Sequence, residues 1–386
     1  MSTPHYVSLF SIAIFFLLLF LPLLVTPLEH DPPHDFLHED PPSNPRLEKA
    51  YVALQAWKHV ITEDPANLTI HWCGPHVCNY TGVFCAAAPD DPDEITVAGI
   101  DLNGGQIAGK LPEELGLLAD LALFHINSNR FAGGLPDALR KMERLFELDV
   151  SNNELEGPFP AVVLDLPALR FLDIRFNRFS GEVPSRVFDL PLDALFLNDN
   201  DFSFTFPPNL GNSTVSVLVL ANTRIAGCFP TSISAMAGTL TELLLLNASL
   251  SSCLPDAIGD LLNLTVLDVG FNALVGHLPA SLGQLKKLEQ LDVAHNNFSG
   301  EVPAAVCELP RLMNFTFSDN YFCGEPEVCS KVQDKDDREN CLPERPKQRP
   351  VEECAEFLAK PPPVCDSNGC IKPPSSPPPT EAKLHE

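Results

Sequence analysis

FELDVSNNELEGPFP (146–160) and QLDVAHNNFSGEVP (290–303) share the pattern L-x-L-x-x-N-x-L-x-G-x-x-P, which also fits FLDIRFNRFSGEVP (171–184) and VLDVGFNALVGHLP (266–279). The pattern recurs every 23 to 25 residues between Ile95 and Cys329. Gly105, Thr223 and Ala248 replace the asparagine in three of its ten copies. One such unit cannot bury its apolar face alone, whereas stacked units form a continuous core. The asparagine column comprises Asn129, Asn153, Asn177, Asn200, Asn272, Asn296 and Asn320.

This period and consensus are typical of the plant form of the leucine-rich repeat. We therefore predict an α/β repeat solenoid of ten plant-type repeats over residues 95–330. Within each repeat, the two leucine-type residues of L-x-L point inward from a short parallel strand. The residue between them then faces the concave side. The asparagine turns inward, where its amide can bond to backbone groups that the bend leaves unpaired.

The segments that flank the repeats predict a secreted chain with capped ends. Leu9–Val25 is apolar but short for a membrane span, which favours a signal peptide over a retained signal anchor. Apolar residues at helical spacing from Leu47 to Ile61, followed by Pro65, predict a helix that covers the first coil. The predicted parts are a signal peptide (1–26), a disordered Pro/Asp-rich leader (27–45), an N-terminal cap (46–94), the repeats (95–330), a Cys-rich hinge (331–371) and a Pro-rich tail (372–386).

Composition agrees with an extracellular location. The chain has twelve cysteines, and its net charge of −26 disfavours nucleic acid and favours basic partners. No second apolar stretch follows the signal, so we expect no membrane span in the mature chain. N-glycosylation sequons lie at Asn67, Asn79, Asn212, Asn247, Asn263, Asn297 and Asn314.

The asparagine column is weakest at two neighbouring repeats. Thr223 can make few of the bonds and Ala248 none. Cys228 and Cys253 each follow five residues later, at equivalent positions of adjacent coils. Because stacked coils lie about 5 Å apart, we predict a Cys228–Cys253 disulfide that contributes about 3 kcal/mol in the chain-entropy model.

The concave positions predict a ligand-binding surface. Apolar residues at this level span three central coils, and a contiguous patch of that kind usually marks a contact site. Aspartates flank the patch on both sides, which suits a basic amphipathic peptide. The alternative is that the aspartates are solvated surface. The candidate ligand-binding residues are Asp149, Asp173, Phe196, Val219, Leu244, Leu246, Asp268 and Asp292, and the patch also includes Ala194, Val217 and Ala221.

The sequence contains no constellation typical of catalysis. His125 has no His or Cys at metal-ligand spacing, and Pro32 and Pro33 interrupt the spacing of His30, His34 and His38. No nucleophile-elbow pattern occurs. We therefore expect no enzyme, no catalytic residue, no metal and no cofactor.

Several longer stretches resemble the plant leucine-rich repeat extensins. They are AGIDLN (98–103), ELGLLADLALFHINSNRF (114–131), VFDLPLDALFLNDNDF (187–202), AGCFPTSI (226–233) and DDRENCLPERPKQR (336–349). The resemblance implies a non-catalytic protein of the cell wall that binds small basic signalling peptides of the rapid alkalinization factor type. It also implies association with wall polysaccharide and a role in wall formation and growth. After Cys370 only Ser375–Pro379 is similar to the Ser-Pro-rich extensin repeats. We therefore expect a vestigial or missing extensin tail, either because the chain is a short member of the family or because the sequence is incomplete.

The resemblance extends to the cysteines of the N-terminal cap. It implies a Cys78–Cys85 bridge, which leaves Cys73 as a spare thiol. At the other end Cys307–Cys329 and Cys323 compete, and both end groups hold an odd number of cysteines. A spare thiol predicts an exposed cysteine or a disulfide-linked homodimer. Two other functions fit a secreted ten-repeat protein: an inhibitor of microbial polygalacturonases and a structural wall protein.

Overall fold

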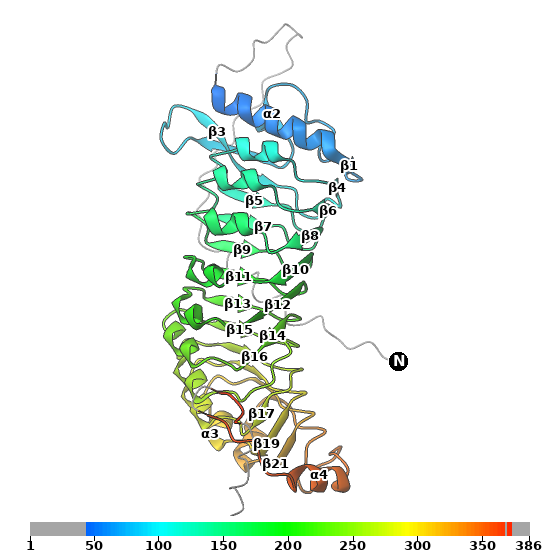
Figure 1. The fold of residues 1–386 in the computed structure, drawn as a ribbon, viewed down its shortest axis with the longest axis vertical. Coiled ribbons are helices and arrows are strands. Elements are labelled where there is room, and N and C mark those ends of the chain that lie inside the picture. The colour runs from blue at the N-terminus through cyan, green and yellow to red at the C-terminus, as the bar shows by residue number, and fades with distance from the viewer. Residues whose placement is uncertain (1–43, 367–368, 373–386) are drawn as a thin grey trace, which may run out of the picture. The chain divides into compact units, whose positions relative to one another are not determined.

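A computed structural model describes residues 44–366 and 369–372 of the chain. The expected signal peptide, nearly all of the leader and the tail after residue 372 lie outside the described residues, as do His30, His34 and His38. The described part is a stack of coils, each of which adds one short strand to a long sheet (Figure 1). The predicted leucine-rich repeat solenoid is therefore confirmed.

The long sheet contains twelve strands within the described residues. All of its pairs are parallel except the first, where β2 pairs antiparallel with β3. The middle residue of each three-residue strand from β5 to β20, such as Leu148, Leu172 and Leu267, is at most 1% exposed, as the L-x-L pattern predicts. The strands are β2 (Val83–Ala87), β3 (Ile95–Asp101), β5 (Leu123–His125), β7 (Glu147–Asp149), β9 (Phe171–Asp173), β11 (Ala194–Phe196), β13 (Val217–Val219), β15 (Glu242–Leu244), β16 (Val266–Asp268), β18 (Gln290–Asp292), β20 (Asn314–Thr316) and β22 (Asp334–Asp336).

The asparagine column forms the predicted buried ladder. Asn153 Nδ2 donates to Ile126 O at 2.9 Å and to Val150 O at 3.1 Å, while its Oδ1 accepts from Phe131 N at 3.0 Å. These bonds satisfy backbone groups that the turn removes from the sheet. The two weak rungs of this ladder are Thr223 and Ala248, which replace the asparagine. Thr223 keeps one bond, from Oγ1 to Leu220 O at 2.6 Å. The same arrangement recurs at Asn129, Asn177, Asn200, Asn272, Asn296 and Asn320.

A second layer of strands runs beside the long sheet and is interrupted at the weak rungs. Coil seven has no strand of its own in this layer, where Cys253 makes only an isolated bridge to Val275. Before the break lie β1 (Ile61–Glu63), β4 (Ala108–Gly109), β6 (Arg130–Gly133), β8 (Glu154–Pro158), β10 (Arg178–Glu182), β12 (Asp201–Thr205) and β14 (Arg224–Ala226). After it lie β17 (Val275–Gly276), β19 (Asn297–Glu301) and β21 (Tyr321–Gly324).

The predicted Cys228–Cys253 disulfide is wrong. The structure instead joins Cys228 to Cys370, with Cα atoms 5.0 Å apart, and Cys253 to Cys365, with Cα atoms 6.1 Å apart. Cys228 and Cys253 do lie at equivalent positions of adjacent coils, as expected. The C-terminal segment, however, returns along the stack and lies over the break, where Cys253 N donates to Gly369 O at 2.9 Å. We call this segment, residues 359–366 and 369–372, the return strap. It lies over the interruption of the second layer, where Cys365 and Cys370 are the nearer partners of Cys253 and Cys228.

A helix and a disulfide form the N-terminal end of the described residues. Helix α2 (Pro45–Val60) begins at an Asn44 N-cap and buries Trp57 against Phe124 and Phe131, each with ring centroids 5.6 Å away. Trp72 is fully buried, and a disulfide joins Cys78 to Cys85. The aromatic rings seal the open end of the first coil.

Short helices form the back of the coils. A proline stands at the N-cap of each of them except η1, which lies in the N-terminal cap and follows His76. They are η1 (Val77–Asn79), η2 (Glu113–Leu117), η3 (Asp137–Lys141), η4 (Ala161–Asp165), η5 (Ser185–Asp189), η6 (Pro208–Asn212), η7 (Thr231–Met236), η8 (Asp256–Asp260), η9 (Ala280–Gln284), α3 (Ala304–Cys307) and η10 (Glu327–Lys331).

The first part of the expected hinge is an additional coil. Asn340 repeats the ladder bonds, with Nδ2 donating to Phe317 O at 3.0 Å, and β22 pairs with β20. At the inward strand position, Lys335 replaces leucine and forms ion pairs with the buried Glu325 and with Asp337. Ion pairs take the place of apolar contacts in this coil. The hydrophobic repeat therefore ends at Cys329, one coil before the stack itself ends.

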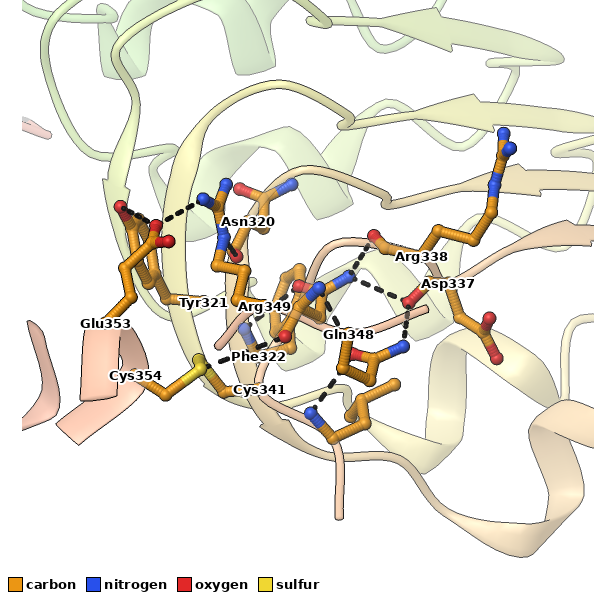
Figure 2. Close-up of a disulfide and its surroundings, with 12 residues drawn as sticks. Asn320, Tyr321, Phe322, Asp337, Arg338, Cys341, Gln348, Arg349, Glu353 and Cys354 are labelled. Carbon is orange, nitrogen blue, oxygen red and sulfur yellow. Dashed lines mark hydrogen bonds and ion pairs between the residues drawn. A yellow bond between two sulfur atoms is a disulfide. The ribbon is translucent and has the colours of Figure 1, made fainter. Parts of the chain in front are cut away.

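A disulfide closes this C-terminal end (Figure 2). It links Cys341 to Cys354 of helix α4 (Val351–Leu358). Arg349 Nε donates to Asn320 O at 2.8 Å, and its guanidinium lies 4.4 Å from the centroid of the Tyr321 ring (Figure 2). Cys307 pairs with Cys329, so within the described residues the free thiols are Cys73 and Cys323, both exposed.

Candidate ligand-binding surface

The side of the long sheet between β3 and β20 that points away from the buried leucines is called the strand face. Register places the predicted concave residues in one row, with Asp149, Asp173 and Phe196 on successive strands. The row continues through Val219, Leu244 and Asp268 to Asp292. The candidate residues chosen from the sequence therefore lie side by side on one surface.

The centre of the strand face is apolar, as predicted. Ala194, Phe196, Val219 and Ala221 form a separate cluster on this side of the sheet. Only 4% of Val219 and 6% of Phe196 is exposed, because side chains on neighbouring parallel strands pack against one another. The apolar surface that this cluster leaves accessible is therefore mainly its partly exposed rim, which comprises Phe171, Val217, Leu244 and Leu246.

One edge of the apolar cluster carries a buried ion pair. Arg175 Nε lies 3.0 Å from Asp173 Oδ2, and the Asp173 side chain is 1% exposed. Burial raises the pKa of Asp173 well above its usual range, and the Arg175 guanidinium opposes that rise. The same guanidinium covers the Phe196 ring, with Cζ 4.9 Å from the ring centroid. Arg175 was not among the predicted site residues, although it is the one basic side chain in its concave column.

The other edge holds a carboxylate pair. Asp268 and Asp292 are register partners on β16 and β18. Burial, and then the neighbouring Asp292 carboxylate, raise the pKa of Asp268 to about 7, and burial also raises the pKa of Asp292. A methyl group at Gly270 would lie 3.1 Å from Asp292 Oδ1 and 3.2 Å from Asp268 Oδ1, so a side chain at position 270 would crowd both carboxylates.

The N-terminal part of the strand face is polar and already bonded internally. Asp149 accepts from Asn127 Nδ2 at 2.9 Å and from Ser151 Oγ at 2.6 Å. His125 Nε2 lies 3.1 Å from Glu147 Oε2, and although burial lowers its pKa, the bond to Glu147 raises the pKa of His125 overall. Among the described residues, no three His, Cys, Asp or Glu side chains are arranged to hold a metal ion.

The sequons differ in accessibility. Asn67, Asn79, Asn212 and Asn247 are exposed, whereas Asn263, Asn297 and Asn314 are half-buried. Asn314 starts β20 and lies on the strand face, but Asn297 starts β19 in the second layer. Of these two, a glycan on Asn314 alone would restrict access to the C-terminal end of the strand face.

Comparison with known proteins gives the same fold. A leucine-rich repeat family model matches residues 287–309. The leucine-rich repeat ectodomain of the Arabidopsis receptor kinase HAESA, solved with an extended IDA peptide hormone, is 29% identical with a TM-score of 0.67, covering 77% of this chain and 50% of that one. A TDR receptor structure is 27% identical with a TM-score of 0.60, covering 64% and 44% of the two chains.

Curated relatives are much closer in sequence. Leucine-rich repeat extensin-like protein 6 of Arabidopsis thaliana is 67% identical over 89% of this chain and 74% of its own length. Leucine-rich repeat extensin-like protein 3 of the same plant is 62% identical over 88% of this chain, but over only 45% of its own length. With that identity and coverage, the chain belongs to the leucine-rich repeat extensin-like family.

Proposed function

We propose that this protein is an extracellular, wall-associated repeat protein that binds small basic cysteine-rich peptides, of the rapid alkalinization factor type, on the strand face. Binding of this kind would modulate wall formation and cell growth. The observation that carries the proposal is the apolar cluster with buried carboxylates at both edges. Such a surface complements an apolar peptide segment flanked by cationic side chains.

Two further findings support it. The HAESA ectodomain, which shares the fold at 29% identity, was solved with a peptide hormone. The net charge of −26 would attract a basic peptide and speed its association.

The disulfides support the proposed extracellular location, which is oxidising. Five bridges join described cysteines, a number typical of secreted proteins. Over the part of the chain that the structure describes, no helix is long and apolar enough to cross a membrane. We propose the cell wall as the location from the family's extensin character.

The test is titration of the disulfide-bonded protein with a basic cysteine-rich peptide of this type. Leu244→Asp with Leu246→Asp places charge on the partly exposed rim and should weaken binding by about 2 kcal/mol, or roughly thirtyfold. Leu262→Asp with Val52→Asp is the matched control with the same added charge, because both side chains are exposed and lie away from the strand face, beyond η8 and on helix α2. We prefer these positions to Val219, whose burial would confuse a folding defect with a binding defect.

Equal affinity of the rim variant and the control would remove the peptide site from the strand face. Capture of a polygalacturonase in place of the peptide would favour the inhibitor alternative. Retention by wall polysaccharide without either ligand would favour a structural role.

A further inference from the structure

Two hydrogen-bond acceptors remain unsatisfied on the strand face beside the apolar cluster. Asp173 Oδ2 and Asn198 Oδ1 are buried and accept no hydrogen bond within the described residues. Asn198 is fully buried, and its Nδ2 donates to Asp199 Oδ2 at 2.7 Å. Buried acceptors of this kind are costly unless a donor or cation reaches them.

These acceptors lie around one aromatic ring. Asp173 is the register partner of Phe196, and Asn198 follows Phe196 by two residues on the same face. The Phe196 ring also packs against Phe171, with centroids 5.5 Å apart. A carboxylate, an amide oxygen and a ring face together suit a planar cation that donates several N–H bonds and stacks.

Arg175 already places such a cation here. Its Nε is 3.0 Å from Asp173 Oδ2, although the two do not align as a hydrogen bond, and its Cζ is 4.9 Å from the Phe196 centroid. The Arg175 side chain is 18% exposed, so it lies between the buried acceptors and solvent. Its exchange for a second guanidinium would leave the buried carboxylate compensated throughout.

We propose that Asp173, Phe196 and Asn198 form a guanidinium subsite, occupied by Arg175 in the unliganded protein and taken over by an arginine of the bound basic peptide. The exchange step rests on the proposed function, whereas the subsite itself does not. A lysine would serve less well, because its ammonium is a compact charge that cannot stack as a plane on Phe196.

The first experiment vacates the subsite with Arg175→Ala and adds methylguanidinium, with methylammonium as the competing probe. Methylguanidinium at millimolar concentration should raise the melting temperature of this variant by about 2 °C or more, because a ligand of the folded state stabilises it. Methylammonium should do less. Arg178→Ala is the control for charge, since Arg178 forms an exposed pair with Glu154 on the second layer. The same response in both variants, or no preference for methylguanidinium, would overturn the subsite.

The second experiment measures peptide affinity. Arg175→Ala should bind the basic peptide at least threefold more tightly than Arg178→Ala, although both lose one positive charge. Arg175→Lys keeps the charge and guards against misfolding of the alanine variant; it should also bind more tightly than the wild type. Replacing the peptide's arginines by lysines should reduce affinity about tenfold. Weaker binding by both Arg175 variants would contradict the exchange.

The two proposals fail separately. Peptide binding that depends on Leu244 and Leu246, without a methylguanidinium response, would retain the function and remove the subsite. A selective methylguanidinium response in a protein that binds no basic peptide would retain the subsite and remove the function.

Discussion

Coils eight to ten and coils six to seven hold their neighbours in different ways. In the first group, Asn272, Asn296 and Asn320 each bond to carbonyls of their own and the preceding coil, and the second layer is continuous. At Thr223 and Ala248 that ladder fails, the second layer stops, and the return strap takes over through two disulfides. Local repetition thus stabilises one region, whereas a distant segment of the chain stabilises the other.

Removal of a strap disulfide should have the largest effect. Cys253→Ser with Cys365→Ser opens a loop of sequence separation 112, which would contribute about 5 kcal/mol in the chain-entropy model if it were the sole bridge over this stretch. Because Cys228–Cys370 still encloses the same residues in this variant, we expect a loss of about 3.5 kcal/mol. Cys78→Ser with Cys85→Ser opens a separation of only 7, for which the same model gives about 2.5 kcal/mol. Urea unfolding under non-reducing conditions should show this order. If the two variants lost the same free energy of unfolding, the Cys253–Cys365 bridge would not constrain the unfolded chain as the length of its loop implies.

A ladder residue should come next. Asn296→Ala leaves Val269 O, Val293 O and Leu274 N without their partner, and we expect a loss of about 3 kcal/mol. Thr223→Ala removes a single bond at the break and should cost about 1 kcal/mol. The comparison of the two regions would be wrong if the threonine variant lost as much stability as the asparagine variant.

Asp268, in coil eight, should make the free energy of unfolding moderately dependent on pH. Because the pKa of Asp268 is raised from 3.8 to about 7, the folded state retains a proton that the unfolded chain releases. This contribution to stability is complete below about pH 4 and is lost as the pH rises to about 7.

Asp268→Asn should flatten that dependence, whereas Asp256→Asn, at an exposed position on η8, should not. The charges of His295 and Asp336 act on Asp292, whose own pKa burial raises, so some dependence should persist. Calorimetry from pH 4 to 8 tests it. An unchanged slope in Asp268→Asn would assign the effect to another group.

The smallest effect on stability should come from the spare thiols. Cys73 and Cys323 are exposed and unpaired, so two thiols per chain should react with a thiol reagent under native conditions. We propose that either can form a disulfide-linked homodimer, and Cys73→Ser with Cys323→Ser should abolish such a species on non-reducing gels without shifting the unfolding midpoint. A covalent dimer that survived in the double variant would require one of the five bridges to open.

Periodicity explains what could be predicted. The inward leucines, the asparagine ladder and the row from Asp149 to Asp292 follow from a repeat of constant length, so each residue's neighbours are known in advance. The N-terminal helix was also predictable, since an open first coil must be covered.

The features that could not be predicted do not follow the repeat pattern. The strap pairs cysteines 112 and 142 residues apart, and nothing in the repeat specifies where the hinge returns. The extra coil at Asn340 was missed because Lys335 and its acidic partners replace the large apolar residue that the ten predicted coils have at this position. Arg175 was passed over because a charge on a surface strand is usually solvated, and only the geometry shows that it covers a buried carboxylate.

The strap also determines how the molecule would carry tension. Force applied to the chain beyond Cys370 crosses the disulfide directly to Cys228, so residues 229–369 form a covalently closed loop outside the line of pull. Coils seven onward, together with α4 and the C-terminal disulfides, would stay slack while the first six coils bear the load. A wall-attached chain built in this way would keep the carboxylate pair at Asp268 and Asp292 mechanically isolated, even as the rest of the array is stretched.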